Sequence, residues 1–280
     1  MQTPSPVRPR VMGIVNLTPD SFSDGGRHLA FDAALAEARR LIADGAEILD
    51  LGAESTRPGA EPVAAEVEIA RLVPLIEALA AETGAPVSVD TMKPEVARAA
   101  VAAGATLWND VTALGFAPDS LAVAAELGCE VVLMHMQGEP RTMQHEPRYD
   151  DVVAEVCAFL AARAARAEAA GVARERIWLD PGLGFGKHRT RHNLPLLAGL
   201  GAVTALGYPV LLGASRKSFI GALDPAGAAA PQDRVGGSIA AALAGAAAGV
   251  AAVRVHDVRE TRQALAVWAA IEGARREAGR

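Results

Sequence analysis

One arrangement of apolar and polar positions recurs along the chain. An alanine-rich segment with helical spacing is followed by a glycine, a short apolar run and then polar residues. A glycine just beyond a helix supplies the left-handed conformation that ends it. An apolar run without alternation suits a strand that is buried on both faces of a parallel sheet. The pattern predicts eight strands, within residues 9–18, 43–52, 82–91, 102–111, 126–135, 173–182, 205–215 and 247–257.

Strand and helix alternate over the whole length without a break in composition, which predicts successive βαβ units. A length of 280 residues suits one α/β barrel. We therefore expect residues 1–280 to form a single domain, a (β/α)8 or TIM barrel, with an open doubly wound sheet as the alternative. The expected helices lie near residues 30–44, 62–82, 94–103, 118–128, 150–170, 192–205, 232–248 and 258–275.

Composition narrows the class of protein. The chain is 51% hydrophobic and has a formal net charge of −6. This balance argues against a nucleic-acid partner, which needs a basic face, although a few cations can still be focused in a pocket for an anionic substrate. Cys129 and Cys157 stand in no metal-ligand spacing and make no disulfide framework, so we expect both to pack as small apolar residues.

Neither targeting nor membrane insertion is indicated. The first ten residues are polar and proline-rich, with no apolar segment behind them. Residues 236–253 carry no charge, but they are mostly Ala and Gly, are broken by Gly249 and are closed by Arg254. A buried helix followed by a strand fits this stretch better than a membrane span. We expect a soluble, cytoplasmic protein.

Polar residues gather where the predicted strands end, and the active sites of such barrels lie at that end. Each residue alone has an ordinary explanation; Asp90, for example, could cap the helix that begins at Pro94. The signal is that nearly every strand ends in such residues. They are Asn16, Glu54, Ser55, Thr56, Arg57, Asp90, Asn109, Asp110, Met134, His135, Asp180, Ser215, Arg216, Lys217, Arg254 and His256.

The composition of this set indicates the ligand. Two carboxylates and an amide (Asp90, Asp180 and Asn109), together with Lys217, suit a flat heterocycle rich in donors and acceptors. Cations suit phosphate oxygens, and the candidates are Arg57, Lys217, Arg254 and His256.

No HExxH, four-cysteine or three-histidine arrangement is present, so a protein-caged zinc is not expected. Asn16 and an Asp-bearing loop could contact Mg2+ through phosphates and water, which is the usual binding mode of that ion.

Three loops stand out. Residues 16–28 and 54–63 are longer than a barrel loop requires, which is typical of functional lids; ordinary turn chemistry is the alternative for their Gly and Pro residues. Residues 180–187 are glycine-rich but lack the spacing of a phosphate-binding P-loop. We interpret them as a plain turn that carries one pocket residue.

Several residues favour a structural role. His28, His145, His188 and His192 are expected to face solvent or cap helices, whereas His135 could be either buried structure or a ligand. The three tryptophans are expected to pack between helices and sheet; they are Trp108, Trp178 and Trp268.

The loop sequences resemble the dihydropteroate synthase family. The matching motifs span residues 10–270 in the correct order: MGIVNLTPDSFSDGG, GAESTRPGA, SVDT, WNDV, LMHMQGEPRTMQ, DPGLGFGK, LLGASRKSFIG and RVHDV. The related corrinoid-dependent methyltetrahydrofolate methyltransferases share the barrel and the pterin-site Asp and Asn. They are not expected to carry the NLTPDSFSDGG, ESTRPG or SRKS segments.

The resemblance implies a reaction in which p-aminobenzoate displaces pyrophosphate from 6-hydroxymethyl-7,8-dihydropterin pyrophosphate. It also implies Mg2+ as cofactor, sulfonamides as inhibitors and a homodimer. The implied pterin pocket is Asp90, Asn109, Asp180 and Lys217, with Met134 nearby. Pyrophosphate and Mg2+ would be held by Asn16, Arg254 and His256. The p-aminobenzoate subsite and its loops would include Asp20, Phe22, Thr56, Arg57, Pro58, Phe185 and Ser218.

Two segments depart from the family pattern. HRTR at residues 188–191 is about one residue longer than expected, and GGS at 236–238 replaces the usual GT-A, although Gly236 and Gly237 can still begin a helix. A catalytically silent pterin-binding paralogue and the methyltransferase therefore stay as alternatives to an active synthase.

Overall fold

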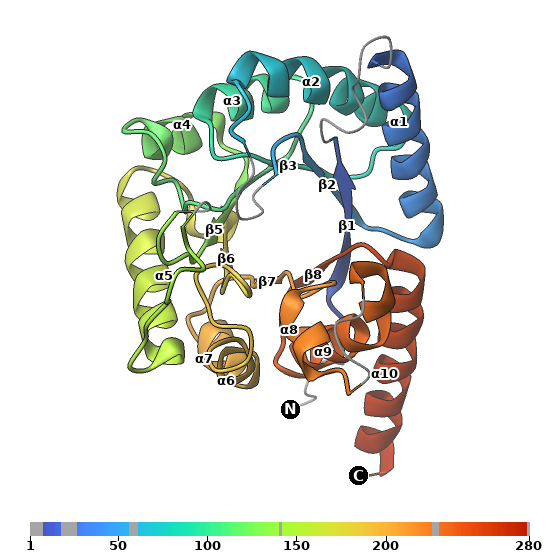
Figure 1. Ribbon diagram of the computed structural model, residues 1–280. Coiled ribbons are helices and arrows are strands. Elements are labelled where there is room, and N and C mark those ends of the chain that lie inside the picture. The colour runs from blue at the N-terminus through green and yellow to red at the C-terminus, as the bar shows by residue number, and fades with distance from the viewer. Residues whose placement is uncertain (1–7, 18–26, 56–60, 140–141, 226–229, 279–280) are drawn as a thin grey trace.

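The protein is described by a computed structural model at residues 8–17, 27–55, 61–139, 142–225 and 230–278. Its strands form a ring that the helices surround (Figure 1). The strands are β1 (Arg10–Asn16), β2 (Ile48–Gly52), β3 (Val87–Asp90), β4 (Leu107–Asp110), β5 (Glu130–Met134), β6 (Ile177–Asp180), β7 (Leu211–Leu212) and β8 (Ala252–Val255).

The helices follow the strands in sequence. They are α1 (Arg27–Asp44), α2 (Ala65–Glu82), α3 (Pro94–Ala102), α4 (Ser120–Leu127), α5 (Val152–Ala169), α6 (Asn193–Ala198), α7 (Leu200–Thr204), α8 (Ser218–Leu223), α9 (Val235–Ala247) and α10 (Val258–Ala278). Two short 3-10 helices complete the described elements, η2 (Arg174–Arg176) and η3 (Pro231–Arg234).

The sheet closes on itself. Neighbouring strands are parallel in the order β6-β5-β4-β3-β2-β1-β8-β7. A bridge from Leu179 to Val210 then joins the two ends of this order. The (β/α)8 barrel predicted from the sequence is therefore confirmed, and the open doubly wound sheet is wrong, because an open sheet leaves two edge strands apart.

One predicted helix is interrupted. The single helix expected at residues 192–205 is two helices, α6 and α7, which meet at Gly199. A Cβ atom at this position would lie 2.7 Å from Cγ2 of Val153 on α5, so the junction packs too closely for a side chain. Helix α8 was not predicted, because its six residues are too few to show a helical period.

Apolar side chains form two separate clusters, one on each face of the sheet. Successive side chains of a strand point to opposite faces. The larger cluster lies between the strands and the helices, and the smaller one fills the inside of the barrel. The inner cluster is Met12, Ile48, Leu107, Val132, Trp178, Leu211 and Ala252. Burial on both faces explains why the strands are apolar without alternation.

The tryptophans divide between these clusters. Trp108 belongs to the outer cluster, as predicted, and its Nε1 donates to the carbonyl oxygen of Thr91 at 2.7 Å. Trp268 packs against the same cluster. The prediction for Trp178 is wrong, since its side chain lies inside the barrel with the guanidinium of Arg10 4.9 Å from the ring centre.

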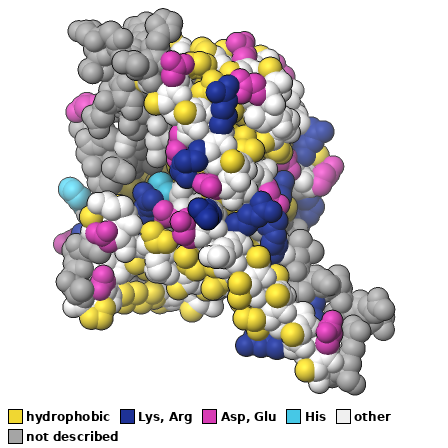
Figure 2. Space-filling model, turned by 90° about the vertical axis from the view of Figure 1, so that its right-hand side faces the viewer, with side chains coloured by type: hydrophobic (Ala, Val, Ile, Leu, Met, Phe, Trp, Pro, Cys, Tyr) yellow, Lys and Arg dark blue, Asp and Glu magenta, His cyan; other side chains and the backbone are white. Residues whose placement is uncertain are grey.

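The surface is mixed in charge. On the side shown in Figure 2, basic and acidic side chains are interspersed and form no continuous basic stripe. Within the described part of the chain, no helix combines the length and the apolar character that a membrane crossing requires. The uncharged stretch 236–253 forms most of α9 and the start of β8, as its sequence predicted.

Leu107 offers a test of the inner cluster, because its side chain is 1% exposed inside the barrel. We expect Leu107→Ala to lower the free energy of unfolding by about 2–5 kcal/mol, the range for a large core residue reduced to Ala. Urea denaturation measures this change. The control is Leu223→Ala, at a side chain that is 52% exposed, which should change stability by less than about 0.5 kcal/mol. Equal losses in the two variants would contradict the assignment.

Candidate active site

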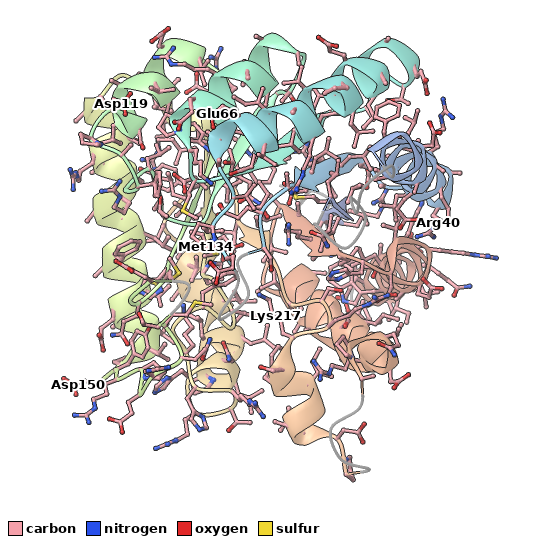
Figure 3. The ribbon with its side chains drawn as sticks, turned by 45° about the horizontal axis from the view of Figure 1, so that its top comes forward. Arg40, Glu66, Asp119, Met134, Asp150 and Lys217 are labelled. Atoms are coloured by element: carbon pink, nitrogen blue, oxygen red, sulfur yellow. The ribbon has the colours of Figure 1, made fainter. Side chains whose placement is uncertain are left out.

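The predicted site residues that the structure describes lie at one end of the barrel. Asp90 ends β3, Asp180 ends β6 and Met134 ends β5. In Figure 3, Met134 and Lys217 lie near the centre of the view, whereas Asp150 lies at the periphery. The barrel thus brings together residues that are far apart in the sequence.

Arg254 on β8 is held between two carboxylates. Its Nε donates to Oδ2 of Asp50 at 2.5 Å, and its Nη2 donates to Oδ2 of Asp90 at 2.8 Å. Asp50 also accepts from Oγ of Ser88 at 2.5 Å and from Nδ2 of Asn109 at 3.3 Å. Arg254 therefore lies between Asp50 and Asp90 in the structure, and its contact with pyrophosphate stays a prediction.

Asp50 is a central residue that sequence reasoning missed. It is 0% exposed, in the middle of the apolar strand β2. A buried carboxylate is costly unless it is paired. The signal is nevertheless present in the sequence, as one acidic residue inside the run ILDLG. Polar residues at strand ends alone do not reveal it, because Asp50 lies mid-strand.

The two predicted carboxylates resist ionisation. Burial raises the pKa of Asp90 to about 7. The positive charge of Arg254 opposes this shift, but Arg254 is shared with Asp50, and the negative charge of Asp50 raises the pKa of Asp90 further. Burial also raises the pKa of Asp180, against the effects of the backbone N–H of Gly182 and of Lys217. Protons are therefore held at this end of the barrel more tightly than on free carboxylates.

Lys217 follows β7 and faces these acids. Its Nζ lies 4.2 Å from the centre of the Phe185 ring, a cation–π contact. Burial and Arg254 lower the pKa of Lys217 to about 8, while Asp180 and Asp90 oppose the shift. Phe185, predicted to frame an aromatic subsite, thus packs directly against the ammonium group.

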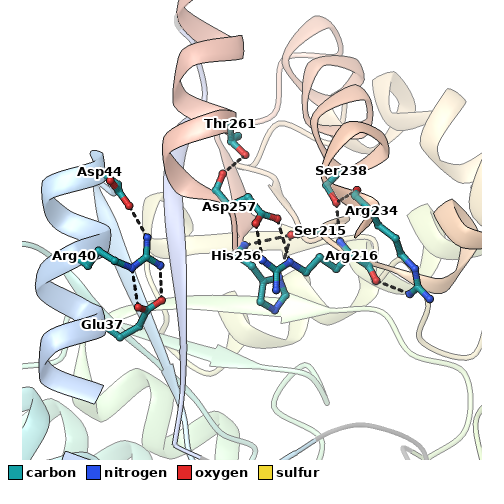
Figure 4. A network of polar contacts seen from close by, with 10 residues as sticks. All are labelled: Glu37, Arg40, Asp44, Ser215, Arg216, Arg234, Ser238, His256, Asp257 and Thr261. Atoms are coloured by element: carbon teal, nitrogen blue, oxygen red, sulfur yellow. Dashed lines mark hydrogen bonds and ion pairs between the residues drawn. The ribbon is translucent and has the colours of Figure 1, made fainter. Parts of the chain in front are cut away.

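His256 follows β8 and is hydrogen-bonded to Ser215. Burial, Arg216 and Arg254 lower the pKa of His256 to about 4. Its Nδ1 lies 3.0 Å from Oγ of Ser215 (Figure 4). The imidazole is therefore uncharged at neutral pH, and its contact with pyrophosphate stays a prediction.

The backbone beside Lys217 is fixed in an unusual conformation. Arg216 has a φ of 57°, which is uncommon for a residue with a side chain. Its side chain donates two hydrogen bonds to Asp257, and its backbone N–H donates to Oγ of Ser238 at 2.9 Å (Figure 4). These contacts from α9 and the start of α10 hold the turn that presents Lys217.

The glycine-rich loop after β6 is built around Lys187. Its Nζ donates to the carbonyl oxygens of Gly182 at 2.9 Å and Phe185 at 3.1 Å, and lies 2.8 Å from Nδ1 of His135. His135 is thus a buried structural residue, one of the two roles left open for it. The loop is no P-loop, but the interpretation as a plain turn with one pocket residue was too simple, because sequence reasoning missed Lys187.

The remaining predicted residues are placed as follows. Asn16 is exposed at the end of β1, and Ser218 is exposed at the start of α8. Asp110 serves its own loop, where it accepts from the backbone N–H groups of Thr112 and Leu114. Five predictions lie outside the described residues: Asp20, Phe22, Thr56, Arg57 and Pro58.

The fold and the site define an α/β barrel with a buried, acid-rich mouth, and comparison with known proteins identifies its class. The family described as "Pterin binding enzyme" matches residues 12–256. Dihydropteroate synthase of Escherichia coli K12 is 49% identical over 259 residues, which are 92% of this chain and 90% of that protein. The chain therefore belongs to the pterin-binding enzymes and, within them, to the dihydropteroate synthase family.

Solved structures agree. A dihydropteroate synthase from Xanthomonas albilineans with 4-aminobenzoic acid is 53% identical, has a TM-score of 0.88 and covers 95% of this chain and 94% of its own. A Yersinia pestis dihydropteroate synthase in a sulfonamide drug complex is 46% identical, with a TM-score of 0.88 and 95% of each chain covered. The family resemblance found in the loop motifs is confirmed.

The raised pKa of Asp90 has a consequence for stability. Because the folded protein binds this proton more tightly than the unfolded chain, Asp90 contributes stability below about pH 4 that is lost as the pH rises to about 7. We expect the stability of Asp90→Asn, relative to wild type, to increase between pH 4 and 7. Denaturation at several pH values measures it. Asp150→Asn, at an exposed side chain, should give a constant difference, and a constant difference for Asp90→Asn would contradict the shift.

Two glycines separate steric contact from backbone strain in the loop after β6. Gly186 and Gly84 have nearly the same φ, 58° and 61°, but a Cβ at Gly186 would lie 2.2 Å from the carbonyl oxygen of Gln137, whereas one at Gly84 meets nothing within 4 Å. We expect Gly84→Ala to cost about 1–2 kcal/mol from strain alone. Gly186→Ala should cost more, as thermal unfolding will show. Equal costs would mean that the loop does not pack on Gln137.

Proposed function

We propose that the protein condenses 6-hydroxymethyl-7,8-dihydropterin pyrophosphate with p-aminobenzoate to give 7,8-dihydropteroate and pyrophosphate. The observation that carries this proposal is the convergence of Asp90, Asn109, Asp180 and Lys217 on one barrel end, around the Asp50–Arg254 pair. A fixed set of donors and acceptors of this kind suits the edge of a pterin ring.

The contacts assign complementary roles to the amide and the acids. Asn109 donates from Nδ2 to Asp50, which leaves its Oδ1 to accept from an N–H group of the pterin. Asp180 accepts from the backbone of Gly182 through Oδ1, so its Oδ2 is the oxygen available to the ring. Lys217 supplies a donor from the opposite side of the site.

The charges of the site suit a displacement in which the C–O bond to pyrophosphate is largely broken in the transition state. As the C–O bond to pyrophosphate breaks, positive charge develops on the pterin methylene, where the carboxylates of Asp90 and Asp180 offset it. The amine nitrogen of p-aminobenzoate forms the new C–N bond and then releases a proton to solvent. An amine that loses its proton late needs no strong general base. Arg254 and His256 stay the predicted partners of the departing pyrophosphate.

Mg2+ would be bound mainly through the substrate. Among the described residues, no group of three His, Cys, Asp or Glu side chains could hold a metal ion. Asn16, exposed at the end of β1, offers an amide oxygen, a ligand type that Mg2+ accepts alongside phosphate oxygens and water. We propose that Asn16, pyrophosphate and water hold the ion, which supplies positive charge to the departing pyrophosphate.

We propose that p-aminobenzoate and sulfonamides compete for one subsite beside Phe185 and Ser218. The Xanthomonas and Yersinia synthases hold 4-aminobenzoic acid and a sulfonamide drug, respectively, and Phe185 is the aromatic ring that flanks Lys217. The loop residues Asp20, Phe22, Thr56, Arg57 and Pro58 stay predicted parts of this subsite.

We also propose that residues 1–280 form a single domain and that the protein works in the cytoplasm as a homodimer. Light scattering after size exclusion tests the oligomeric state.

Activity of two variants tests the site. We expect Asp90→Asn and Lys217→Met each to lower kcat/KM on the order of 10²-fold, the typical effect of removing one charge-stabilising group. A coupled assay of pyrophosphate release, with dihydropteroate identified by mass spectrometry, measures this. Asp150→Asn, at the periphery in Figure 3, should keep wild-type turnover. Pterin binding without product from the wild-type protein would refute the proposed function, and wild-type turnover in both site variants would refute the site.

A further inference from the structure

Lysine is rare in this chain and occurs only after strands at one end of the barrel. Of the 27 basic residues, only Lys93, Lys187 and Lys217 are lysines. Each follows a strand at the same end of the barrel, and each ammonium contacts a carboxylate, a carbonyl oxygen or an aromatic ring. Arginine serves at every other basic position. The three lysines are therefore gathered at the mouth of the barrel.

Lys93 has no part in the site described so far. It is 8% exposed, and its Nζ donates to Oε2 of Glu54 at 2.8 Å and to Oε1 of Glu68. Glu68 on α2 is 0% exposed. Three charges are thus buried together. Burying charges costs free energy that their mutual attraction does not necessarily return, so stability alone is a weak reason for such a cluster.

The cluster is connected to the base of the segment after β2. Glu54 follows β2, and its Oε1 accepts from the backbone N–H of Val63 at 2.9 Å. One side chain therefore joins residues 54 and 63, the two ends of the predicted loop that carries Thr56, Arg57 and Pro58. The other oxygen of Glu54 ties this junction to Lys93.

The same cluster is connected to the floor of the site. Thr91 lies next to Asp90, and its Oγ1 donates to Oε2 of Glu68 at 3.0 Å. The backbone N–H of Thr91 donates to the carbonyl oxygen of Asn109 at 3.1 Å. A continuous series of buried and part-buried contacts therefore runs from Glu54 and Val63 to Thr91, beside Asp90, and to Asn109.

We propose that Glu54, Lys93 and Glu68 form a positioning unit that fixes Glu54 and Val63, the two ends of the segment, relative to Asp90 and thereby sets the affinity for p-aminobenzoate. None of the three needs to touch substrate. This inference rests on the proposed function, because it assigns the segment to the p-aminobenzoate subsite. It predicts that weakening the unit raises the KM for p-aminobenzoate and leaves the KM for the pterin pyrophosphate unchanged.

Glu54→Gln is the sharpest variant, because it leaves the Lys93–Glu68 pair intact. A glutamine has one acceptor oxygen, so it can serve Val63 or Lys93 but not both. We expect the KM for p-aminobenzoate to rise about tenfold, as for loss of one charge-assisted hydrogen bond. The KM for the pterin pyrophosphate and kcat should each stay within about twofold, since the floor is unchanged. A general loss of folded protein would instead lower the apparent kcat and leave both KM values unchanged.

Glu47→Gln is the matched control. Glu47 precedes β2 at the opposite end of the barrel, where it accepts from the backbone N–H of Val11 at 3.2 Å and pairs with Arg8 at 2.7 Å. Like Glu54, it binds one backbone N–H group and one basic side chain, so the same substitution weakens the same two types of interaction. We expect all three kinetic constants to stay at wild-type values.

Hydrogen exchange separates this inference from the proposed function. The Val63 amide should exchange faster in Glu54→Gln than in wild type, and not faster in Glu47→Gln. Unchanged exchange, or equal effects on both substrates, would overturn the positioning unit. If the wild-type protein forms no dihydropteroate, the proposed function fails while the exchange result still decides whether Glu54 fixes the segment.

Discussion

The site depends on one shared cation. Arg254 lies between Asp50 and Asp90, which come from strands β2 and β3, while Arg254 itself comes from β8. These strands lie near one another in the sheet order β3-β2-β1-β8, and the buried charges are tolerated only because each has a partner. Asp50 also orients Asn109. The geometry of Asp50, Asp90 and Asn109 is therefore set by contacts within the protein.

This arrangement places function and stability in opposition. Burial raises the pKa values of Asp90 and Asp180 and lowers those of Lys217 and His256. In each case burial disfavours the charged form of the side chain. The groups that would act on substrate through their charge therefore lie where that charge is least stable. Rigid strands and the pinned turn at Arg216 hold them there. A substrate with matching charges and hydrogen bonds would relieve part of this cost.

The sequence was sufficient for the framework of the barrel and for most of its mouth. Helix-ending glycines and apolar runs predict all eight strands, and polar strand ends identify Asp90, Asn109, Asp180 and Arg254. It was not sufficient for partners that depend on tertiary distance. Asp50 lies mid-strand, Lys187 is buried beneath its own loop and Trp178 points inward. Strands buried on both faces show no alternation that would tell which face Asp50 or Trp178 occupies, and the contacts of Lys187 depend on how its loop folds.

The ratio of lysine to arginine in the composition also carries information about the site. A chain that uses arginine for nearly all of its cations has its three lysines at one end of the barrel, where Lys93 and Lys187 are buried. This contrast within one sequence would have singled out Lys93 and Lys187 together with Lys217, without any comparison to relatives. Lys93 and Lys187 contact the bases of two loops, whereas Lys217 faces Asp180 and Asp90, where the proposed function places the pterin.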